Sequence, residues 1–219
     1  MDFAVITEYI PLYIEAFRLT IVIGWLGILL AVVIGVLTAF LLHFRVPILG
    51  AVAKGYVELF RNTPLLVQLF FIYFGLPKIG ISVSAGLCGI LGLGLLGGSY
   101  MAESIRSGLD AIPASQTESG MALSMTKTQL FGLVVLPQAI SISISGILAN
   151  VIFLLKETSV FSAISLMDLM FTAKDLIGLY YNTTECLFLL VAFYVVMLLP
   201  VSLVGRLVEK KMRYRMFGG

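Results

Sequence analysis

Apolar residues run along this chain in long, nearly charge-free stretches that are separated by short polar segments. The first stretch, residues 19–42, lies between Arg18 and His43 and contains no charged residue. A helix needs about 20 predominantly apolar residues to cross a bilayer. By this criterion we predict an all-α integral membrane protein, a single transmembrane domain over residues 1–219, with five spans at about residues 19–42, 56–76, 79–102, 138–156 and 186–206.

The composition agrees with this pattern. Hydrophobic residues make up 60% of the chain and charged residues 12%, and the mean hydropathy is +1.07. Soluble domains carry about 25% charged residues, so the composition excludes an ordinary soluble protein. Cys88 and Cys186 lie in or beside apolar stretches. We therefore expect buried thiols, with no disulfide framework and no metal site.

The distribution of positive charge predicts an orientation in the membrane. If five spans are drawn, most Lys and Arg residues fall on one side, and the positive-inside rule makes that side cytoplasmic. The N-terminus is then outside, and the basic C-terminal tail is inside. Ten of the 14 Lys and Arg residues lie on the side predicted to be cytoplasmic: Arg45, Lys54, Arg61, Arg106, Lys127, Arg206, Lys210, Lys211, Arg213 and Arg215.

One polar segment, at about residues 107–137, is much longer than a tight turn needs. The Ile112-Pro113 pair is expected to end the preceding helix, and Ser115 with Glu118 has the S-x-x-E spacing of a capping box, which predicts a new short helix. Met121 and Met125 are about one turn apart and would give that helix an adaptable apolar surface. The residues alone leave two interpretations open, a helix lying on the lipid and a helix that docks onto a partner protein.

The spacing within this segment allows a sharper interpretation. Glu118, Ser119 and Gly120 are followed after three residues by Ser124 and after nine more by Val134-Val135-Leu136-Pro137. This resembles the pattern of ABC importer permeases, E-A-A, three residues, G, nine residues, I-x-L-P. The spacing is kept without insertion. Ser119 and Gly120 stand in place of the two alanines, and Ser124 stands in place of the glycine.

Other segments extend the resemblance from about residue 56 to residue 159. They are similar to the R-[GN]-T-P-L-x-x-Q-L, A-Y-x-A-E-x-x-R-G-G, V-L-P-Q-A and L-K-D-[ST]-S motifs of polar amino-acid permeases, the type that carries histidine, glutamine or arginine. The matching segments in this chain are FRNTPLLVQL (60–69), SYMAESIRSG (99–108), VLPQA (135–139) and LKETS (155–159).

The resemblance implies a type I ABC importer permease that moves a polar amino acid by alternating access across a bacterial inner membrane. It implies as partners two cytosolic ATPase subunits, a second permease copy or a homologous permease, an extracytoplasmic solute-binding protein and membrane lipid, but no nucleic acid. The short helix becomes the coupling helix between the third and fourth spans. The residues implied in ATPase coupling are Glu118, Ser119, Gly120, Met121, Ser124, Leu136 and Pro137.

Nucleotide chemistry is expected to lie outside this chain. No glycine is followed by lysine, so a phosphate-binding G-x-x-x-x-G-K-[ST] loop is absent from the sequence. The letters of a G-x-G-x-x-G motif occur at Gly92, Gly94 and Gly97, but inside an apolar stretch, where close helix packing is the better interpretation. We predict that the chain is not an enzyme and binds no cofactor, and that ATP and magnesium sit in the partner ATPase.

The adjacent charges Lys156 and Glu157 end the fourth predicted span. They are consistent with a pair that neutralises itself at the interface, or with recognition of the ammonium and carboxylate of a zwitterionic substrate in a protein-lined path. The second interpretation makes five residues candidates for the substrate path: Lys156, Glu157, Thr158, Ser159 and Gln68.

Two further charge pairs have helical i, i+3 spacing, Glu58 with Arg61 and Glu103 with Arg106. We predict ion pairs at helix ends, with a gating role at the cytoplasmic mouth as the alternative. Two other function classes also remain open. An ion-coupled secondary amino-acid transporter would work without an ATPase, and a non-transporting membrane assembly protein would need no polar path.

Overall fold

The structure is a computed structural model that describes residues 1–217, with side chains described through Met212. Over these residues it contains helices and no strand. The α-helices are α1 (Phe3–His43), α2 (Leu49–Arg61), α3 (Leu65–Phe70), α4 (Ala85–Asp110), α5 (Ala114–Ala122), α6 (Lys127–Leu130), α7 (Leu136–Glu157), α8 (Leu169–Tyr180) and α9 (Thr183–Phe217). The other helical segments of the described residues are two π-helical turns, η1 (Phe71–Gly75) and η3 (Phe131–Val135), and two 3₁₀ segments, η2 (Leu76–Ile79) and η4 (Thr158–Ile164).

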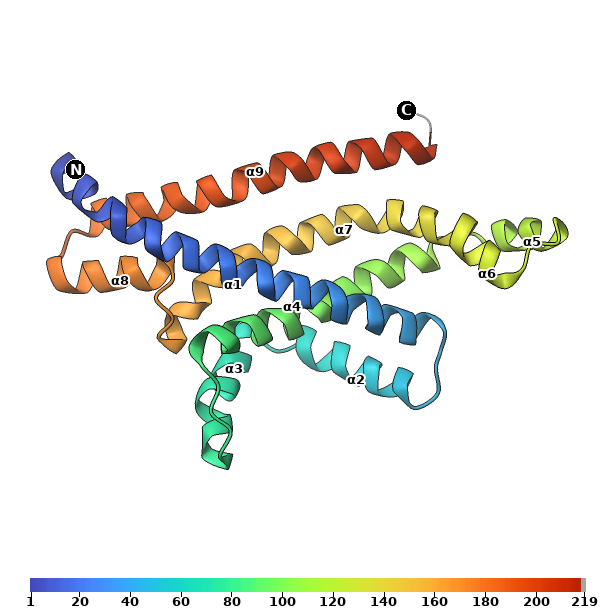
Figure 1. The fold of residues 1–219 in the computed structure, drawn as a ribbon, viewed down its shortest axis with the longest axis horizontal. Coiled ribbons are helices and arrows are strands. Elements are labelled where there is room, and N and C mark those ends of the chain that lie inside the picture. The colour runs from blue at the N-terminus through green and yellow to red at the C-terminus, as the bar shows by residue number, and fades with distance from the viewer. Residues whose placement is uncertain (218–219) are drawn as a thin grey trace.

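The long helices run side by side along the longest axis of the molecule (Figure 1). The N-terminus and α8 lie at one end, whereas α5, α6 and the end of α9 lie at the other (Figure 1). Four helical runs in the described part of the chain are long and apolar enough to cross a membrane: Phe3–His43, Ala85–Asp110, Lys127–Ile164 and Thr183–Met212. A fifth crossing is counted only if the bent pair Leu49–Arg61 and Leu65–Ile79 forms one span.

That bent pair divides the span predicted at about residues 56–76. Leu49–Arg61 and Leu65–Ile79 meet at an angle of 106°. Pro64 disfavours helical backbone at the residue before it. The side chains of Asn62 and Thr63 then donate to the backbone carbonyls of Glu58 and Leu59, at 2.7 Å and 2.9 Å, which completes the end of α2. The following segment runs across the direction of the long helices (Figure 1).

Two other predicted boundaries also differ from the observed helices. The first helix begins at Phe3, where Asp2 caps it by accepting from the backbone N–H of Ala4, so it is much longer than residues 19–42. The helix predicted to begin at residue 79 begins at Ala85. Gly80 adopts a left-handed φ of +85° and ends the preceding 3₁₀ segment, and Ser84 caps the new helix.

Glycines allow α4 to lie at the centre of the bundle, against α1 and α7. A Cβ at Gly94 would collide with Leu30, and one at Gly97 would collide with Ala31 and Leu154. These contacts confirm that the glycines predicted to pack helices do so. Both cysteines are free and buried, as predicted.

Candidate functional site

The segment predicted to contain a coupling helix forms a protruding tip, residues 111–126, which we call the α5 tip. Helix α5 follows Pro113, which has extended backbone and provides no side-chain cap. The predicted capping box at Ser115 and Glu118 is therefore wrong, because Ser115 already lies inside the first turn. The capping box of this region occurs later: Thr126 and Gln129 exchange side-chain and backbone hydrogen bonds at the start of α6.

The turn after α5 forms with serine where the resemblance expects glycine. Ser124 adopts a left-handed φ of 57°. Its backbone N–H donates to Met121 O at 2.9 Å, and that of Met125 donates to Gly120 O at 3.1 Å. Gly120 is the only buried residue of α5, because Leu130 covers it and leaves no room for a Cβ. The substitution at residue 124 therefore preserves the sharp turn.

Most other residues of α5, and Leu123 directly after it, are exposed. Glu118 and Ser119 are exposed, Met121 is 53% exposed and Leu123 is 77% exposed. Glu118 makes no side-chain hydrogen bond or ion pair within the described part of the chain. Leu136 and Pro137 lie at the start of α7, directly after the π-helical turn η3. The tip therefore presents an acidic side chain and apolar side chains that the rest of the chain leaves uncovered.

A cavity of about 410 Å³ lies where α2, α4 and α7 meet, and we call it the Arg61 cavity. Arg61 ends α2, Tyr100 lies within α4, and Glu157 ends α7. The cavity thus holds a guanidinium and a carboxylate contributed by helices that are distant in sequence. Its lining residues are Arg61, Asn62, Thr63, Pro64, Leu65, Leu66, Leu96, Tyr100, Phe153, Glu157 and Val160.

Arg61 pairs across helices and not along its own helix, which corrects the prediction of a Glu58–Arg61 pair. Its Nη1 lies 3.3 Å from Glu103 Oε2, and its guanidinium lies 5.4 Å from the centre of the Tyr100 ring. The Oε2 atom of Glu58 instead lies 3.4 Å from the Nδ2 donor of Asn62.

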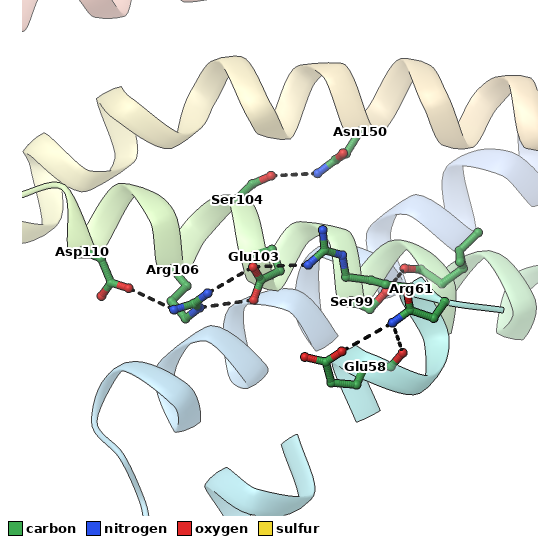
Figure 2. Close-up of polar contacts among 10 residues, drawn as sticks. Glu58, Arg61, Ser99, Glu103, Ser104, Arg106, Asp110 and Asn150 are labelled. Atoms are coloured by element: carbon green, nitrogen blue, oxygen red, sulfur yellow. Dashed lines mark hydrogen bonds and ion pairs between the residues drawn. The ribbon is translucent and has the colours of Figure 1, made fainter. Parts of the chain in front are cut away.

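The predicted pair between Glu103 and Arg106 is present, at 3.1 Å, and it belongs to a longer row of charges. Arg106 also contacts Asp110 at 3.2 Å, and Asp110 lies 3.4 Å from His43 at the end of α1. Figure 2 shows Arg61, Glu103, Arg106 and Asp110 along one side of α4. The row begins at the Arg61 cavity and ends just before the α5 tip.

The structure directs Lys156 and Glu157 to different sides of α7, and their contact with a substrate stays a prediction. Successive helical residues point about 100° apart. Glu157 lines the Arg61 cavity, whereas Lys156 lines a groove of about 620 Å³ between α7 and α9, together with Tyr194 and Arg206.

The remaining candidates for the substrate path stabilise the backbone. Thr158 is fully buried and donates to Leu155 O at 2.7 Å, and the carbonyl of Ser159 accepts from Ser162 at 3.3 Å. Gln68 is buried, and its amide donates to Phe60 O and to both oxygens of Thr63. Gln68 therefore holds the bend that brings Arg61 and Thr63 to the cavity.

A second cavity, of about 370 Å³, lies between α4 and α7, and we call it the Glu103 cavity. Asn150 of α7 donates to Ser104 of α4 at 2.9 Å beside it (Figure 2). The sequence analysis did not predict these polar contacts between α4 and α7, although small polar residues recur on both helices at helical spacing. The lining residues are Glu103, Ser104, Ser107, Gly108, Ile142, Ser143 and Gly146.

Another acidic residue that sequence reasoning missed, Asp168, lies outside both cavities, at the start of α8. It is fully buried and accepts a hydrogen bond from the backbone N–H of Phe171 at 3.0 Å, while its Oδ2 has no hydrogen-bond partner among the described residues. Burial raises the pKa of this carboxyl to about 7. Within the described residues, no three His, Cys, Asp or Glu side chains group in a way that could hold a metal ion.

Comparison with known proteins identifies the family. Residues 31–214 match the family described as binding-protein-dependent transport system inner membrane component. The chain belongs to this family. It is 30% identical to the arginine transport system permease protein ArtQ of Bacillus subtilis, over 97% of this chain and 98% of that protein. It is 32% identical to the putative glutamine transport system permease protein GlnP of Rickettsia typhi, over 91% and 92%.

Solved structures of ABC transporters share the fold of this chain. A crystal structure of an amino acid ABC transporter with histidines matches with a TM-score of 0.90 and 32% identity, over 96% of this chain and 99% of that chain. The MetNI methionine ABC transporter, in an inward-facing conformation, matches with a TM-score of 0.78 at 20% identity. Membership in the family confirms the resemblance found in the motifs and, with the apolar helices, indicates a multi-pass inner membrane protein.

Proposed function

We propose that this permease carries a polar amino acid inward, powered by separate ATPase subunits, and that the amino acid binds in the Arg61 cavity. The observation that carries the proposal is that Arg61 and Glu157, two side chains of opposite charge, line one cavity of about 410 Å³. That volume lies within the roughly 300–1,000 Å³ of small-molecule sites. The relatives named for amino-acid, arginine and glutamine transport support this class of substrate.

The chemistry of the cavity fits a zwitterion. A guanidinium binds a carboxylate through two parallel hydrogen bonds, which fixes orientation as well as charge. The carboxylate of Glu157 provides the matching partner for the α-ammonium. Tyr100 and Phe153, whose ring centroids are 5.3 Å apart, form an apolar wall on which the rest of the substrate can pack. A ligand with both charges satisfies both ends of the site.

The α5 tip is the proposed docking element for the ATPase, which would hold the ATP and magnesium. Glu118, Ser119 and Met121 are exposed on it. It joins α4 through residues 111–113 and α7 through α6 and η3. These are the two helices that border the Glu103 cavity. A displacement of the tip by a closing ATPase would therefore move both walls of that cavity, which is the basis for alternating access.

The proposed topology follows from the ends of the molecule. The α5 tip and the end of α9 share one end (Figure 1), which we assign to the cytoplasm, and the N-terminus and α8 face outward. A solute-binding protein would deliver the amino acid at the outer end. A second permease, identical or homologous, would complete the path at the exposed face of the cavity, and lipid would cover the remaining apolar surface.

The test is reconstitution of the complex, copurified with its ATPase, into liposomes with its binding protein. Uptake of a panel of labelled amino acids that includes glutamine, arginine and histidine is measured with and without ATP. ATP-dependent uptake of at least one of them is expected, and uptake that proceeds without the ATPase would favour an ion-coupled transporter. Direct binding to the complex in nanodiscs, without binding protein, should be at least about tenfold weaker for the amino-acid amide and for the N-acetyl derivative, because each lacks one charge.

A further inference from the structure

The ion pair between Arg61 and Glu103 lies between two cavities. Arg61 lines the Arg61 cavity, and Glu103 lines the Glu103 cavity, which continues along α4 toward the end that carries α5. The two side chains meet at 3.3 Å (Figure 2). Arg61 and Glu103 therefore line different cavities, and their ion pair lies at the boundary between these two cavities.

Arg61 and Glu103 each make other contacts besides their ion pair. Arg106 binds Glu103 through two hydrogen bonds, from Nε at 3.2 Å and from Nη2 at 3.1 Å. Arg61 rests on the face of Tyr100. Both side chains are partly exposed, Arg61 at 39% and Glu103 at 28%. Partly exposed ion pairs contribute little net free energy, so opening this contact would leave no buried, unpaired charge.

We propose that the carboxylate of the substrate displaces Glu103 from Arg61, and that this exchange opens the passage from the Arg61 cavity to the Glu103 cavity. The proposal rests on the proposed function. Before the substrate arrives, Glu103 occupies the guanidinium and closes the contact. When the substrate carboxylate takes its place, Glu103 stays paired with Arg106.

The Glu103 cavity has the chemistry to receive the substrate next. Glu103, released from Arg61, offers a carboxylate to the α-ammonium. The hydroxyls of Ser104, Ser107 and Ser143 line the same cavity and can accept or donate hydrogen bonds to the substrate. The substrate thus passes from one carboxylate, Glu157, to a second, Glu103, while Arg61 engages its carboxylate between them.

In this exchange, Glu103 competes with the substrate carboxylate for the guanidinium of Arg61. Measuring substrate binding without the Glu103 charge therefore tests the proposal. The amino acid's Kd is measured for the copurified complex in nanodiscs without binding protein. Glu103→Gln should lower the Kd about threefold to fivefold, because Arg61 is no longer occupied. Asp110→Asn is the matched control: it removes the ion pair between Arg106 and Asp110 in the same row of charges, does not touch Arg61, and should leave the Kd unchanged.

Two further measurements separate competition from a general structural effect. The amino-acid amide, which lacks the carboxylate, should show no gain from Glu103→Gln. Arg61→Gln should weaken amino-acid binding by about tenfold or more, and adding Glu103→Gln to it should have no further effect, because the contested guanidinium is gone. If Glu103→Gln does not copurify with the ATPase, Glu103→Asp, which withdraws the carboxylate by one methylene, is measured in its place with the same expectation.

The outcomes are distinct. A wild-type complex that binds and transports amino acids, combined with an unchanged Kd in the Glu103 variant, overturns the exchange and leaves the proposed function standing. An equal gain for the amino acid and its amide also overturns the exchange. A wild-type complex that neither binds nor transports any amino acid overturns the proposed function, and the exchange fails with it.

Discussion

The Arg61 cavity and the α5 tip both present an acidic side chain, but the chain builds them in opposite ways. The cavity takes Arg61, Tyr100 and Glu157 from three helices that are distant in sequence, and Arg61 is already paired with Glu103. The tip is one continuous segment, residues 111–126, and Glu118 on it is exposed. A site for a small zwitterion needs opposite charges held at one place by a rigid bundle. A docking element needs only a local helix that the rest of the chain leaves uncovered.

The largest expected effect tests the tip. Glu118→Lys should reduce ATP-dependent uptake by more than about tenfold and reduce copurification of the ATPase, because a reversed charge in a docking contact is strongly unfavourable. Binding of the amino acid to the permease in nanodiscs should stay within about twofold. Lys54→Glu, a charge reversal at an exposed site on α2, is the control and should leave uptake near the wild-type rate. Wild-type copurification and uptake in Glu118→Lys would remove the coupling role of Glu118.

A second prediction uses the two adjacent charges at the end of α7. Glu157→Gln should weaken amino-acid binding to the complex about tenfold, because the α-ammonium loses its ionised partner. Lys156→Met should leave the Kd within about twofold, since Lys156 faces the groove between α7 and α9. Equal effects of the two substitutions would show that the Arg61 cavity is not the binding site.

Asp168 belongs to neither the Arg61 cavity nor the α5 tip. Its full burial is expected to make the stability of the protein depend on pH. Its pKa of about 7 lies above the ordinary value of 3.8. The folded state therefore holds the proton more tightly, and the associated stability is complete below about pH 4 and is lost as the pH rises through 7. Between pH 6 and pH 8 the free energy of unfolding should fall by about 1 kcal/mol. Thermal unfolding of the wild type and of Asp168→Asn measures this, and the variant, which keeps a good N-cap, should lose that part of the pH dependence.

The smallest effect concerns the turn of the tip. Ser124 has a left-handed backbone, which costs a residue with a Cβ more than it costs glycine. Ser124→Gly should therefore stabilise the permease by roughly 0.5 kcal/mol, after the greater entropy of glycine in the unfolded chain is deducted. Ser124→Val should destabilise it by a larger amount, since a β-branched side chain fits that conformation poorly. The midpoints of thermal unfolding compare the three proteins, and a less stable glycine variant would contradict this account of the turn.

Much of the local structure could be predicted from the sequence. The helix predicted at residues 138–156 nearly coincides with α7, Leu136–Glu157, because both signals are local: Pro137 near its start and an uninterrupted apolar run. The short helix before it was also predicted, although its capping box was not where expected. Pro113 directly precedes α5, and Thr126 provides the capping side chain one helix later, at α6.

The bend between α2 and α3 was not predicted, although its sequence signal was present. Thr63-Pro64 favours a break, but hydropathy over residues 56–76 favours one continuous span. The bend is stable because the amide of Gln68 donates to the carbonyls of Phe60 and Thr63 across it. Those hydrogen bonds form only when the two helices are already placed, so neither residue type nor spacing indicated them.

The sequence by itself determined which segments are apolar enough for the membrane, where the α5 tip lies, and to which family the motifs point, because each of these depends on residues close together in the chain. Only the tertiary structure decided which charges meet. Arg61 has Glu58 one turn away, yet it pairs with Glu103 of another helix, and Lys156 and Glu157 point into different cavities. The physical reason is that helical geometry sets the direction of each side chain, and the packing of α2, α4 and α7 then decides what lies in that direction.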